Sequence, residues 1–347
     1  RVIKRSRTLG EIARGQHCLA VAGTHGKTTT STLLAHIFAD SGEGCSAFLG
    51  GISKNYDTNL LVSTNPVIVA EADEFDRSFL QLFPDIAAIT SMDADHLDIY
   101  GNKENYLEAF AQFTERIRED GFLIIHEGLE VTPRTKPGVK TYTYNRESGD
   151  FHAENIRIGG GTIIFDYVSP WQRIEDVELG VPVSINIENG VTSMAMAEIC
   201  GATAEELRCG MASFAGADRR FDFHIKRDDL VMLSDYAHHP AEIMQSLRSM
   251  RQLYKDRKLT AIFQPHLYTR TRDFYREFAE SLSLADEVIL TEIYPARELP
   301  IEGVTSEIIL NDIKNASKTL CMRKDLLDLI KVRNFDILMT LGAADIN

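Results

Sequence analysis

Residues 18–30 read CLAVAGTHGKTTT: a short apolar run, a loop bounded by Gly23 and Gly26, and the beginning of a polar stretch. Apolar residues then recur at positions 33, 34, 37 and 38, a spacing typical of a helix, and Gly42 ends the pattern. The apolar run itself has the composition of a buried strand. The stretch therefore predicts a strand, a glycine-rich loop and a helix in succession.

The loop has the chemistry expected of a phosphate-binding site. Glycines allow backbone N–H groups to close around phosphate oxygens, and the start of a helix adds positive potential. Lys27 can reach the β and γ phosphates of a nucleotide, and Thr28 can bind magnesium. The Walker A pattern requires a further glycine where Val21 stands, so the motif is a shortened variant, and an ordinary glycine-rich turn is the alternative. The predicted ATP-binding residues of the loop are Gly23, Thr24, His25, Gly26, Lys27, Thr28 and Thr29.

Composition places the chain among globular proteins. It has 347 residues, of which 44% are hydrophobic and 25% charged, and its formal net charge is −14. At about 150 residues per domain, this length indicates two domains. The acidic charge argues against nucleic-acid and membrane-surface partners, and no apolar run approaches the ~18 residues of a membrane span. Five scattered cysteines without a CxxC pair are typical of a reduced, cytoplasmic protein.

Alternating strand and helix patterns predict a parallel α/β sheet in the first part of the chain. Short apolar runs at 67–70, 86–89 and 122–125 have the pattern of buried strands, and a helical stripe precedes the third. Residues 132–179 contain alternating runs and a triple-glycine turn, so we expect small antiparallel strands there, at 141–144 and 162–167, packed over Trp171. A helical pattern follows over residues 186–217.

The alternation begins again at residue 230 and predicts a second domain of Rossmann type. Its strand patterns lie at 231–234, 259–263, 288–291 and 337–341, and the boundary is expected near 214–220. We therefore expect a linker or the tail of a preceding domain, a central P-loop ATP-binding domain with a mostly parallel sheet, and a Rossmann-like C-terminal domain. The expected limits of these three segments are 1–14, 15–214 and 215–347.

Two acidic clusters follow strand patterns in the central domain. EADEFD begins at Glu71 and DADHLD begins at Asp93, so both would lie beside the phosphate loop at the carboxyl edge of the sheet. Carboxylate oxygens are preferred magnesium ligands, and His96 could also contact a metal. The alternatives are a solvated loop or helix cap for each cluster and a packing or capping role for His96. The position beside the phosphate loop favours the metal site.

Two polar loops follow neighbouring strand patterns in the second domain. SDYAHHP begins at Ser234 and QPHLYTR begins at Gln264. Carboxylate, phenol, imidazole and guanidinium groups at the open edge of a sheet suit the binding of a nucleotide or a charged substrate. The alternative is helix capping, with Asp235 or His239 at the start of the helix and Pro240 in the first helical turn. Two such loops at adjacent strand ends favour binding.

Taken together, these motifs resemble the Mur ligases, in order and over nearly the whole chain. The matching stretches are GTHGKTT at 23–29, EADE at 71–74, DHLD at 95–98, RRF at 219–221, DYAHHP at 235–240 and PHLYTR at 265–270. The resemblance implies an ATP-dependent amide ligase of peptidoglycan synthesis, with roles in cell wall biogenesis, cell shape and cell division. It points to the branch of the family that joins L-alanine to UDP-N-acetylmuramate through an acyl phosphate, with Mg²⁺ or Mn²⁺ as cofactor.

The resemblance also implies roles for individual residues. Lys27 would hold the β and γ phosphates, Thr28 and Glu71 one magnesium ion, and His96 a second. Further nucleotide contacts are implied for four residues: Asn186 and Asn189 at the adenine, and Arg220 and Asp235 from the C-terminal domain. Substrate-side roles are implied for His238, His239 and Arg270. No side-chain nucleophile is required, because positioning and charge neutralisation carry phosphoryl transfer.

The chain departs from the family pattern in several places. Its phosphate-loop strand begins at residue 18, so the N-terminal UDP-binding domain of the family is expected to be absent, and the chain ends short of the usual last helix. Ile185 stands where we expect His and Ser91 where many relatives carry Asn. Ala344 replaces an expected Gly, which would crowd a close backbone approach.

Two alternative functions remain open on the sequence. One is the sister ligase that recycles muropeptides, although Asp235 followed by Tyr236 favours the alanine-adding branch. The other is a fragment that binds MgATP but turns nothing over, because the UDP-binding domain is what anchors the substrate. The oligomeric state and the activity of this chain alone are left open.

Overall fold

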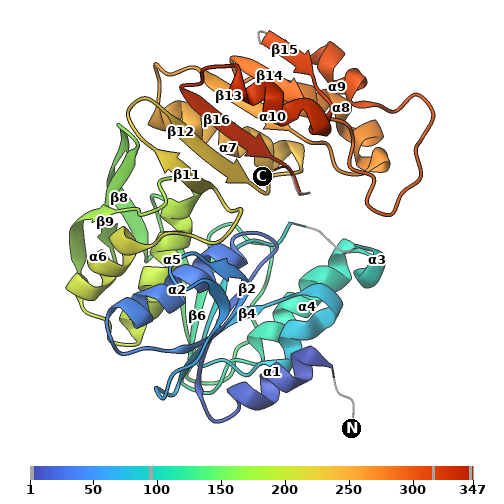
Figure 1. The fold of residues 1–347 in the computed structure, drawn as a ribbon. Helices are drawn as coiled ribbons and strands as arrows, with labels where there is room; N and C mark the ends of the chain where they lie inside the picture. The colour runs from blue at the N-terminus through green and yellow to red at the C-terminus, as the bar shows by residue number, and fades with distance from the viewer. Residues whose placement is uncertain (1–3, 94–96, 315–316, 344–345, 347) are drawn as a thin grey trace. The chain divides into compact units, whose positions relative to one another are not determined.

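The computed structural model describes residues 4–93, 97–314, 317–343 and 346 (Figure 1). The chain forms two compact units. Unit 1 comprises Arg1–Arg157 and Thr162–Asp218, and unit 2 comprises Ile158–Gly161 and Arg219–Asn347. Within the described residues, no helix combines the length and the apolar character needed to cross a bilayer.

Unit 1 is built on a seven-stranded sheet with the order β3-β2-β4-β1-β5-β6-β7. All neighbouring strands are parallel except the β2–β3 pair. The central strands are short and mostly apolar because both of their faces are covered; the exceptions lie at strand ends, such as Glu71 in β4. The strands are β1 (His17–Ala22), β2 (Ser46–Ser53), β3 (Thr58–Leu61), β4 (Val67–Ala72), β5 (Ile86–Ile89), β6 (Phe122–His126) and β7 (Lys140–Tyr144).

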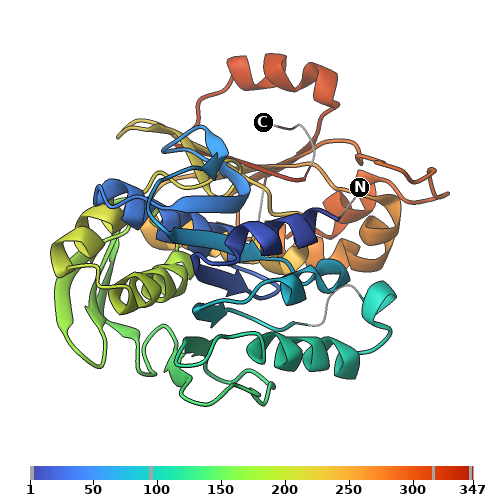
Figure 2. The same ribbon diagram turned by 90° about the horizontal axis from the view of Figure 1, so that it is seen from below.

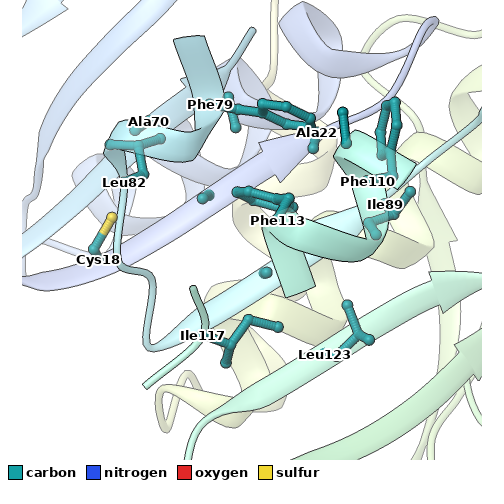
Figure 3. Close-up of a cluster of buried hydrophobic side chains, with 14 of the residues drawn as sticks. Cys18, Ala22, Ala70, Phe79, Leu82, Ile89, Phe110, Phe113, Ile117 and Leu123 are labelled. Atoms are coloured by element: carbon teal, nitrogen blue, oxygen red, sulfur yellow. The ribbon is translucent and has the colours of Figure 1, made fainter. Parts of the chain in front are cut away.

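Helices cover both faces of this sheet (Figures 1 and 2). On one face α2 packs against α5 and α6, and the other face is covered by α1, η1 and α4. The alternation of strand side chains assigns Cys18, Ala20 and Ala22 to the second face, where they join the aromatic core of η1 and α4 (Figure 3). The helical segments are α1 (Arg5–Ala13), α2 (Lys27–Asp40), η1 (Phe75–Gln81), α3 (Leu97–Tyr100), α4 (Lys103–Thr114), α5 (Ile185–Ile199) and α6 (Ala204–Ser213).

Small β-strand side chains make room for large rings in that core. Phe79 and Phe113 stack with ring centroids 4.9 Å apart, and Phe110 meets Phe79 edge-on at 5.2 Å. All three rings are buried against the alanines of β1 and β4. This packing fixes the turn that follows β4, and with it the acidic residues at the carboxyl end of that strand.

The region after β6 corrects two sequence predictions. The strand expected at 141–144 is not part of an antiparallel group, because β7 pairs parallel with β6 and extends the large sheet. Three antiparallel strands do follow, β8 (His152–Gly159), β9 (Thr162–Val168) and β10 (Arg173–Glu178). Trp171 does not lie under them: it is 52% exposed and contacts Tyr142 and Phe151 edge-on.

Unit 2 has a six-stranded sheet with the order β11-β12-β16-β13-β14-β15. Only the β11–β12 pair is antiparallel among the described pairs. The inner parallel strands β12, β13, β14 and β16 are mostly apolar, as expected for a sheet covered on both faces, whereas the edge strand β15 reads SKTL and is largely exposed. The elements are β11 (Asp222–Lys226), β12 (Val231–Asp235), α7 (Pro240–Leu253), β13 (Leu259–Phe263), α8 (Tyr268–Leu282), β14 (Glu287–Leu290), α9 (Ser306–Asp312), β15 (Ser317–Leu320), α10 (Arg323–Lys331) and β16 (Ile337–Leu341).

Candidate active site

The loop between β1 and α2 requires its two glycines. Gly26 caps α2 with a φ of 82°, and Gly23 has a φ of 137°, both in the left-handed region that disfavours side chains. A Cβ on Gly23 would overlap the Thr90 hydroxyl and lie 2.8 Å from the Ser91 amide nitrogen. The backbone of the loop therefore passes directly against the residues that follow β5.

Those residues hold the loop in place. The Thr90 hydroxyl donates to the His25 carbonyl oxygen at 2.5 Å, and the His25 N–H donates to the Ser91 hydroxyl oxygen at 2.7 Å. The Thr24 N–H donates to the Ser91 carbonyl oxygen at 3.2 Å. Ser91, one of the departures from the family pattern, is thus a direct support of the loop.

Thr24 and His25 contact the beginning of the second acidic cluster. The Thr24 hydroxyl lies 2.8 Å from the Asp93 carbonyl oxygen and 2.7 Å from the Tyr106 hydroxyl. His25 Nε2 lies 3.4 Å from the Asp93 carboxylate, and both side chains are exposed. The cluster therefore begins beside the phosphate loop, as predicted. His96, the predicted second metal ligand, lies outside the described residues.

Lys27, in the first turn of α2, directs its ammonium group toward the loop. Its Nζ donates to the Gly23 carbonyl oxygen at 2.5 Å and lies 3.3 Å from the Thr24 carbonyl oxygen. It also pairs with both carboxylate oxygens of Glu74, at 3.0 and 2.8 Å. The ammonium thus lies against the same backbone that would surround a phosphate.

Thr28, the next residue, meets Glu71 from β4. The Thr28 hydroxyl donates to one Glu71 oxygen at 3.3 Å, and the Gly50 N–H donates to the other at 2.9 Å. Burial raises the pKa of Glu71, while Lys27, Thr28 and Gly50 act in the opposite direction. A cation bound at this carboxylate would offset the cost of its burial.

The donor set at Thr28 and Glu71 fits a magnesium ion bound together with a nucleotide. Among the described residues, no group of three or more His, Cys, Asp or Glu side chains could hold a metal by itself. Mg²⁺ is usually bound by one or two protein oxygens, substrate phosphates and waters rather than by an all-protein cage. One hydroxyl and one carboxylate beside a phosphate loop meet that requirement.

Asn186 and Asn189, the predicted adenine contacts, lie in the first turns of α5 and are both buried. Asn189 accepts a hydrogen bond from the Thr30 hydroxyl at 3.2 Å and donates to the Asn186 side chain at 3.0 Å. A Cβ on Gly26 would lie 2.8 Å from the Asn189 oxygen. The structure therefore brings the pair to the phosphate loop and α2.

In unit 2, Arg220 contacts the ring of Tyr236, the residue that follows Asp235. The guanidinium carbon of Arg220 is 5.2 Å from the Tyr236 ring centroid, within the range of a cation–π contact. Asp235, at the end of β12, accepts hydrogen bonds from the Ser246 hydroxyl and the Phe221 N–H. Burial raises the pKa of Asp235, and Ser246 and Arg220 oppose that effect.

His238 and His239 both contact Glu242, but in different roles. His239 caps α7, and its N–H donates to the Glu242 carboxylate at 3.1 Å, completing a capping box. The helix-capping alternative therefore holds for His239. His238 lies outside the helix, with Nδ1 3.0 Å from the Tyr236 carbonyl oxygen. Burial and the nearby Arg270 and Arg220 lower the pKa of His238, although Glu242 opposes them.

Arg270 lies near His238 and His266, at the carboxyl edge of the unit 2 sheet. The His238 and His266 rings are 6.2 Å apart, and burial followed by the charge of Arg270 lowers the pKa of His266. Three buried polar atoms here have no hydrogen-bond partner among the described residues: Gln264 Oε1, His266 Nδ1 and Arg270 Nη1. Buried groups of this kind are normally satisfied, so their clustering indicates a binding surface.

Sequence reasoning gave no separate role to Glu74 or Gly50. Glu74 stood within the quoted EADE motif, but the turn that brings it to Lys27 could not be read from the pattern. Gly50 belongs to β2, which was not predicted. The pair Gly50-Gly51 was the available signal, because paired glycines inside a strand often mark a close approach.

The comparison with known proteins agrees with this geometry. Residues 21–197 match the family model described as the Mur ligase middle domain, and residues 219–343 match the Mur ligase, glutamate ligase domain. The UDP-N-acetylmuramate–L-alanine ligase of Phocaeicola vulgatus is 60% identical over 346 residues, covering 99% of this chain and 76% of that protein. The enzyme of the same name from Parabacteroides distasonis is 58% identical, covering all of this chain and 75% of its own.

Solved structures give the same result. The UDP-N-acetylmuramate–alanine ligase of Thermotoga maritima has a TM-score of 0.82 at 25% identity, covering 98% of this chain and 75% of that one. The MurF ligase of the same organism, solved in complex with ADP, shares the fold with a TM-score of 0.70 at 18% identity, covering 99% and 81%. Both family models and the close relatives lead to one conclusion: the chain belongs to the Mur ligase family.

Proposed function

We propose that this chain carries out the ATP-dependent joining of L-alanine to UDP-N-acetylmuramate in peptidoglycan precursor synthesis. The relatives at 58–60% identity carry this activity in their names, and they align with essentially the whole chain. The observation that carries the proposal is the convergence of Lys27, Thr28 and Glu71 at the start of α2, beside a glycine loop. This is a site for a magnesium nucleotide.

The proposed reaction has two chemical steps. A carboxylate oxygen of the muramoyl group attacks the γ phosphorus of ATP, forming an acyl phosphate as the bond to the β-γ bridging oxygen breaks and ADP leaves. The amine of L-alanine then attacks the acyl carbon, giving a tetrahedral intermediate that expels inorganic phosphate and leaves the amide; the amine loses a proton. Positioning and charge neutralisation are sufficient for these steps, without a side-chain nucleophile.

Within unit 1, each residue of the proposed site has a distinct role. The Lys27 ammonium neutralises charge on the β and γ phosphates, and the backbone N–H groups of Gly23 and Gly26 hold phosphate oxygens, while the N–H groups of Thr24 and His25 anchor the loop to Ser91. Thr28 and Glu71 would hold Mg²⁺, which supplies Lewis-acid stabilisation of phosphate charge. Asn186 and Asn189, which support Gly26 and α2, are proposed to contact the adenine.

The residues of unit 2 have proposed roles toward the nucleotide and the substrates. Arg220 and Asp235 would contact the nucleotide. Arg270 supplies a cation at a surface where Gln264 Oε1, His266 Nδ1 and Arg270 Nη1 are buried without a hydrogen-bond partner among the described residues, which suits an anionic substrate group. His238, whose pKa is lowered by burial, is proposed to contact the same group as a neutral imidazole. His239 Nδ1 already accepts a hydrogen bond from the Ala241 N–H at 3.4 Å, so we propose that His239 contacts the substrate only through the rest of its ring.

An ADP-release assay tests this function. We expect ADP to form only when MgATP, UDP-N-acetylmuramate and L-alanine are all present, with the alanyl product detected by mass spectrometry. ADP release that requires a ready-made peptide in place of L-alanine would identify the muropeptide-recycling branch instead. Nucleotide binding without turnover under any of these conditions would contradict the ligase activity of this chain.

A further inference from the structure

Glu74 forms a buried ion pair with the lysine of the phosphate loop. Glu74 is only 2% exposed, and both of its carboxylate oxygens lie within 3.0 Å of Lys27 Nζ. The Lys27 side chain is itself only 13% exposed. In such surroundings each charge depends on the other, because removing one partner leaves the second buried and uncompensated.

The local fold holds Glu74 at this position. Its carbonyl oxygen accepts hydrogen bonds from the Tyr100 hydroxyl at 2.5 Å and from the Arg77 N–H at 2.9 Å. The next turn contains two consecutive residues in the left-handed region, Asp76 with a φ of 52° and Arg77 with a φ of 54°. Such backbone is retained only where the surroundings enforce it, so the turn that directly follows Glu74 has a fixed conformation.

The ammonium group has no donor to spare for a phosphate. Lys27 has three N–H donors, and the structure uses them on the Gly23 carbonyl, the Thr24 carbonyl and Glu74. To contact a β or γ phosphate, Lys27 must give up at least one of these bonds. Glu74 is the only anion among these three acceptors, so it competes most directly with the negative charge of a nucleotide.

We propose that Glu74 is a positioning residue that competes with the nucleotide phosphates for Lys27 and so lowers nucleotide affinity. The carboxylate holds the ammonium at the loop before nucleotide binds and takes it back as ADP leaves. A weaker hold on ADP favours product release, which limits turnover in many enzymes. This inference rests on the proposed contact of Lys27 with the phosphates.

The test compares MgADP binding by calorimetry in the unsubstituted protein, Glu74→Gln and Asp76→Asn. Glu74→Gln keeps the size of the side chain but removes its charge, and we expect MgADP to bind about tenfold more tightly, the effect of one charge-assisted contact. Asp76→Asn removes the same charge two residues away, where an exposed carboxylate pairs with Lys4, and a change under about twofold is expected.

A simple loss of structure at position 74 would weaken binding, so the sign of the change is diagnostic. Equal or weaker binding of MgADP by Glu74→Gln contradicts the inference, including the case in which Glu74 is a metal ligand. The KM for ATP should also fall in this variant. If Glu74→Gln does not fold, Glu74→Asp withdraws the carboxylate by one methylene and is expected to increase affinity in the same direction; no increase overturns the proposal.

A double-mutant cycle separates this inference from the proposed function. If Glu74 acts through Lys27, the fold-change in MgADP affinity caused by Glu74→Gln differs between the unsubstituted protein and the Lys27→Ala background, where no ammonium is left to compete for. An equal fold-change in both backgrounds overturns the inference and leaves the role of Lys27 intact. A Lys27→Ala variant that binds MgADP as tightly as the unsubstituted protein contradicts the proposed role of Lys27 itself.

Discussion

Lys27 begins α2 with its ammonium group turned back onto the loop carbonyls of Gly23 and Thr24. The same loop is supported by Thr90 and Ser91, so its backbone N–H groups are held in position before any ligand arrives. Preorganised donors cost no reorganisation when charge moves onto the transferring phosphoryl group. At the scale of single residues, catalysis in this account depends on positioned charge.

Replacing Lys27 by Ala removes the cation proposed to stabilise negative charge on the transferring phosphoryl group. We expect turnover to fall on the order of 10³-fold, as for other groups that stabilise a phosphoryl-transfer transition state. Lys103→Ala is a suitable control, because Lys103 is an exposed lysine that pairs with the exposed Glu130. A steady-state assay in which Lys27→Ala kept more than about a tenth of the activity would be incompatible with the assignment.

Gly50→Ala tests the proposed metal site without changing a ligand. Its new Cβ would lie 2.6 Å from the Glu71 carboxyl carbon and overlap both carboxylate oxygens, so Glu71 must move. We expect the Mg²⁺ concentration for half-maximal activity to rise by roughly tenfold, the effect of a small misplacement in a charged site. Gly51→Ala, whose Cβ would lie 3.2 Å from Thr28 Cγ2, should have a smaller effect. The same magnesium dependence in both variants would count against Glu71 as a ligand.

At the scale of elements, the antiparallel group β8–β10 is held by a carboxylate that the fold buries. Asp166 in β9 accepts hydrogen bonds from Arg173 at 2.7 Å, from Asn155 at 2.8 Å and from the Asp176 N–H at 3.1 Å. Burial alone would raise its pKa, but these partners together lower the pKa from 3.8 to about 2. The ionised form is therefore the form that stabilises this sheet.

This shift has a defined consequence for acid stability. Because the folded pKa is lowered, the contribution of Asp166 is fully present above pH 3.8 and is lost as the pH falls toward about 2. We expect Asp166→Asn to lower the melting temperature at pH 7, and the difference from the unsubstituted protein to narrow between pH 4 and pH 2. A difference that stays constant across this range in thermal denaturation would show that Asp166 contributes through packing alone.

Helices and strands with a clear local sequence pattern were predictable. The strands β1, β4, β5 and β6 each contain an uninterrupted apolar run because both faces of the sheet are covered, and the Gly-Lys-Thr sequence marks the start of α2. The partner of β7 was not predictable. Its alternating sequence KTYTY is typical of a half-exposed antiparallel strand, yet it pairs parallel with β6, and pairing direction is set by distant parts of the chain.

The candidate site follows the same division. Lys27, Thr28 and Glu71 were found from motifs, because the chemistry requires these residue types at the ends of strands. Glu74 lies at the start of η1, next to a left-handed turn and to the aromatic packing of η1 and α4, neither of which has a local sequence signature. The sequence offered Asp235 or His239 as the cap of α7, and the structure decides for His239 and places its neighbour His238 outside the helix.

On the scale of the whole molecule, each of the two units has its own sheet and its own buried core. The residues proposed for the nucleotide divide between them: the phosphate loop and Glu71 lie in unit 1, and Arg220 and Asp235 lie in unit 2. Each unit thus carries residues to which the proposed ligation assigns a role. We expect this reaction to proceed through an acyl phosphate formed from the substrate carboxylate.

Transfer of oxygen-18 from the substrate carboxylate to the released phosphate tests whether the acyl phosphate forms. UDP-N-acetylmuramate labelled with oxygen-18 in the lactyl carboxylate is converted with MgATP and L-alanine, and the released phosphate is analysed by mass spectrometry. Because the carboxylate oxygen that attacks the γ phosphorus leaves with phosphate, we expect one labelled oxygen in each phosphate and one in the amide carbonyl. Phosphate without label, formed alongside the alanyl product, would contradict the acyl phosphate and with it the proposed mechanism.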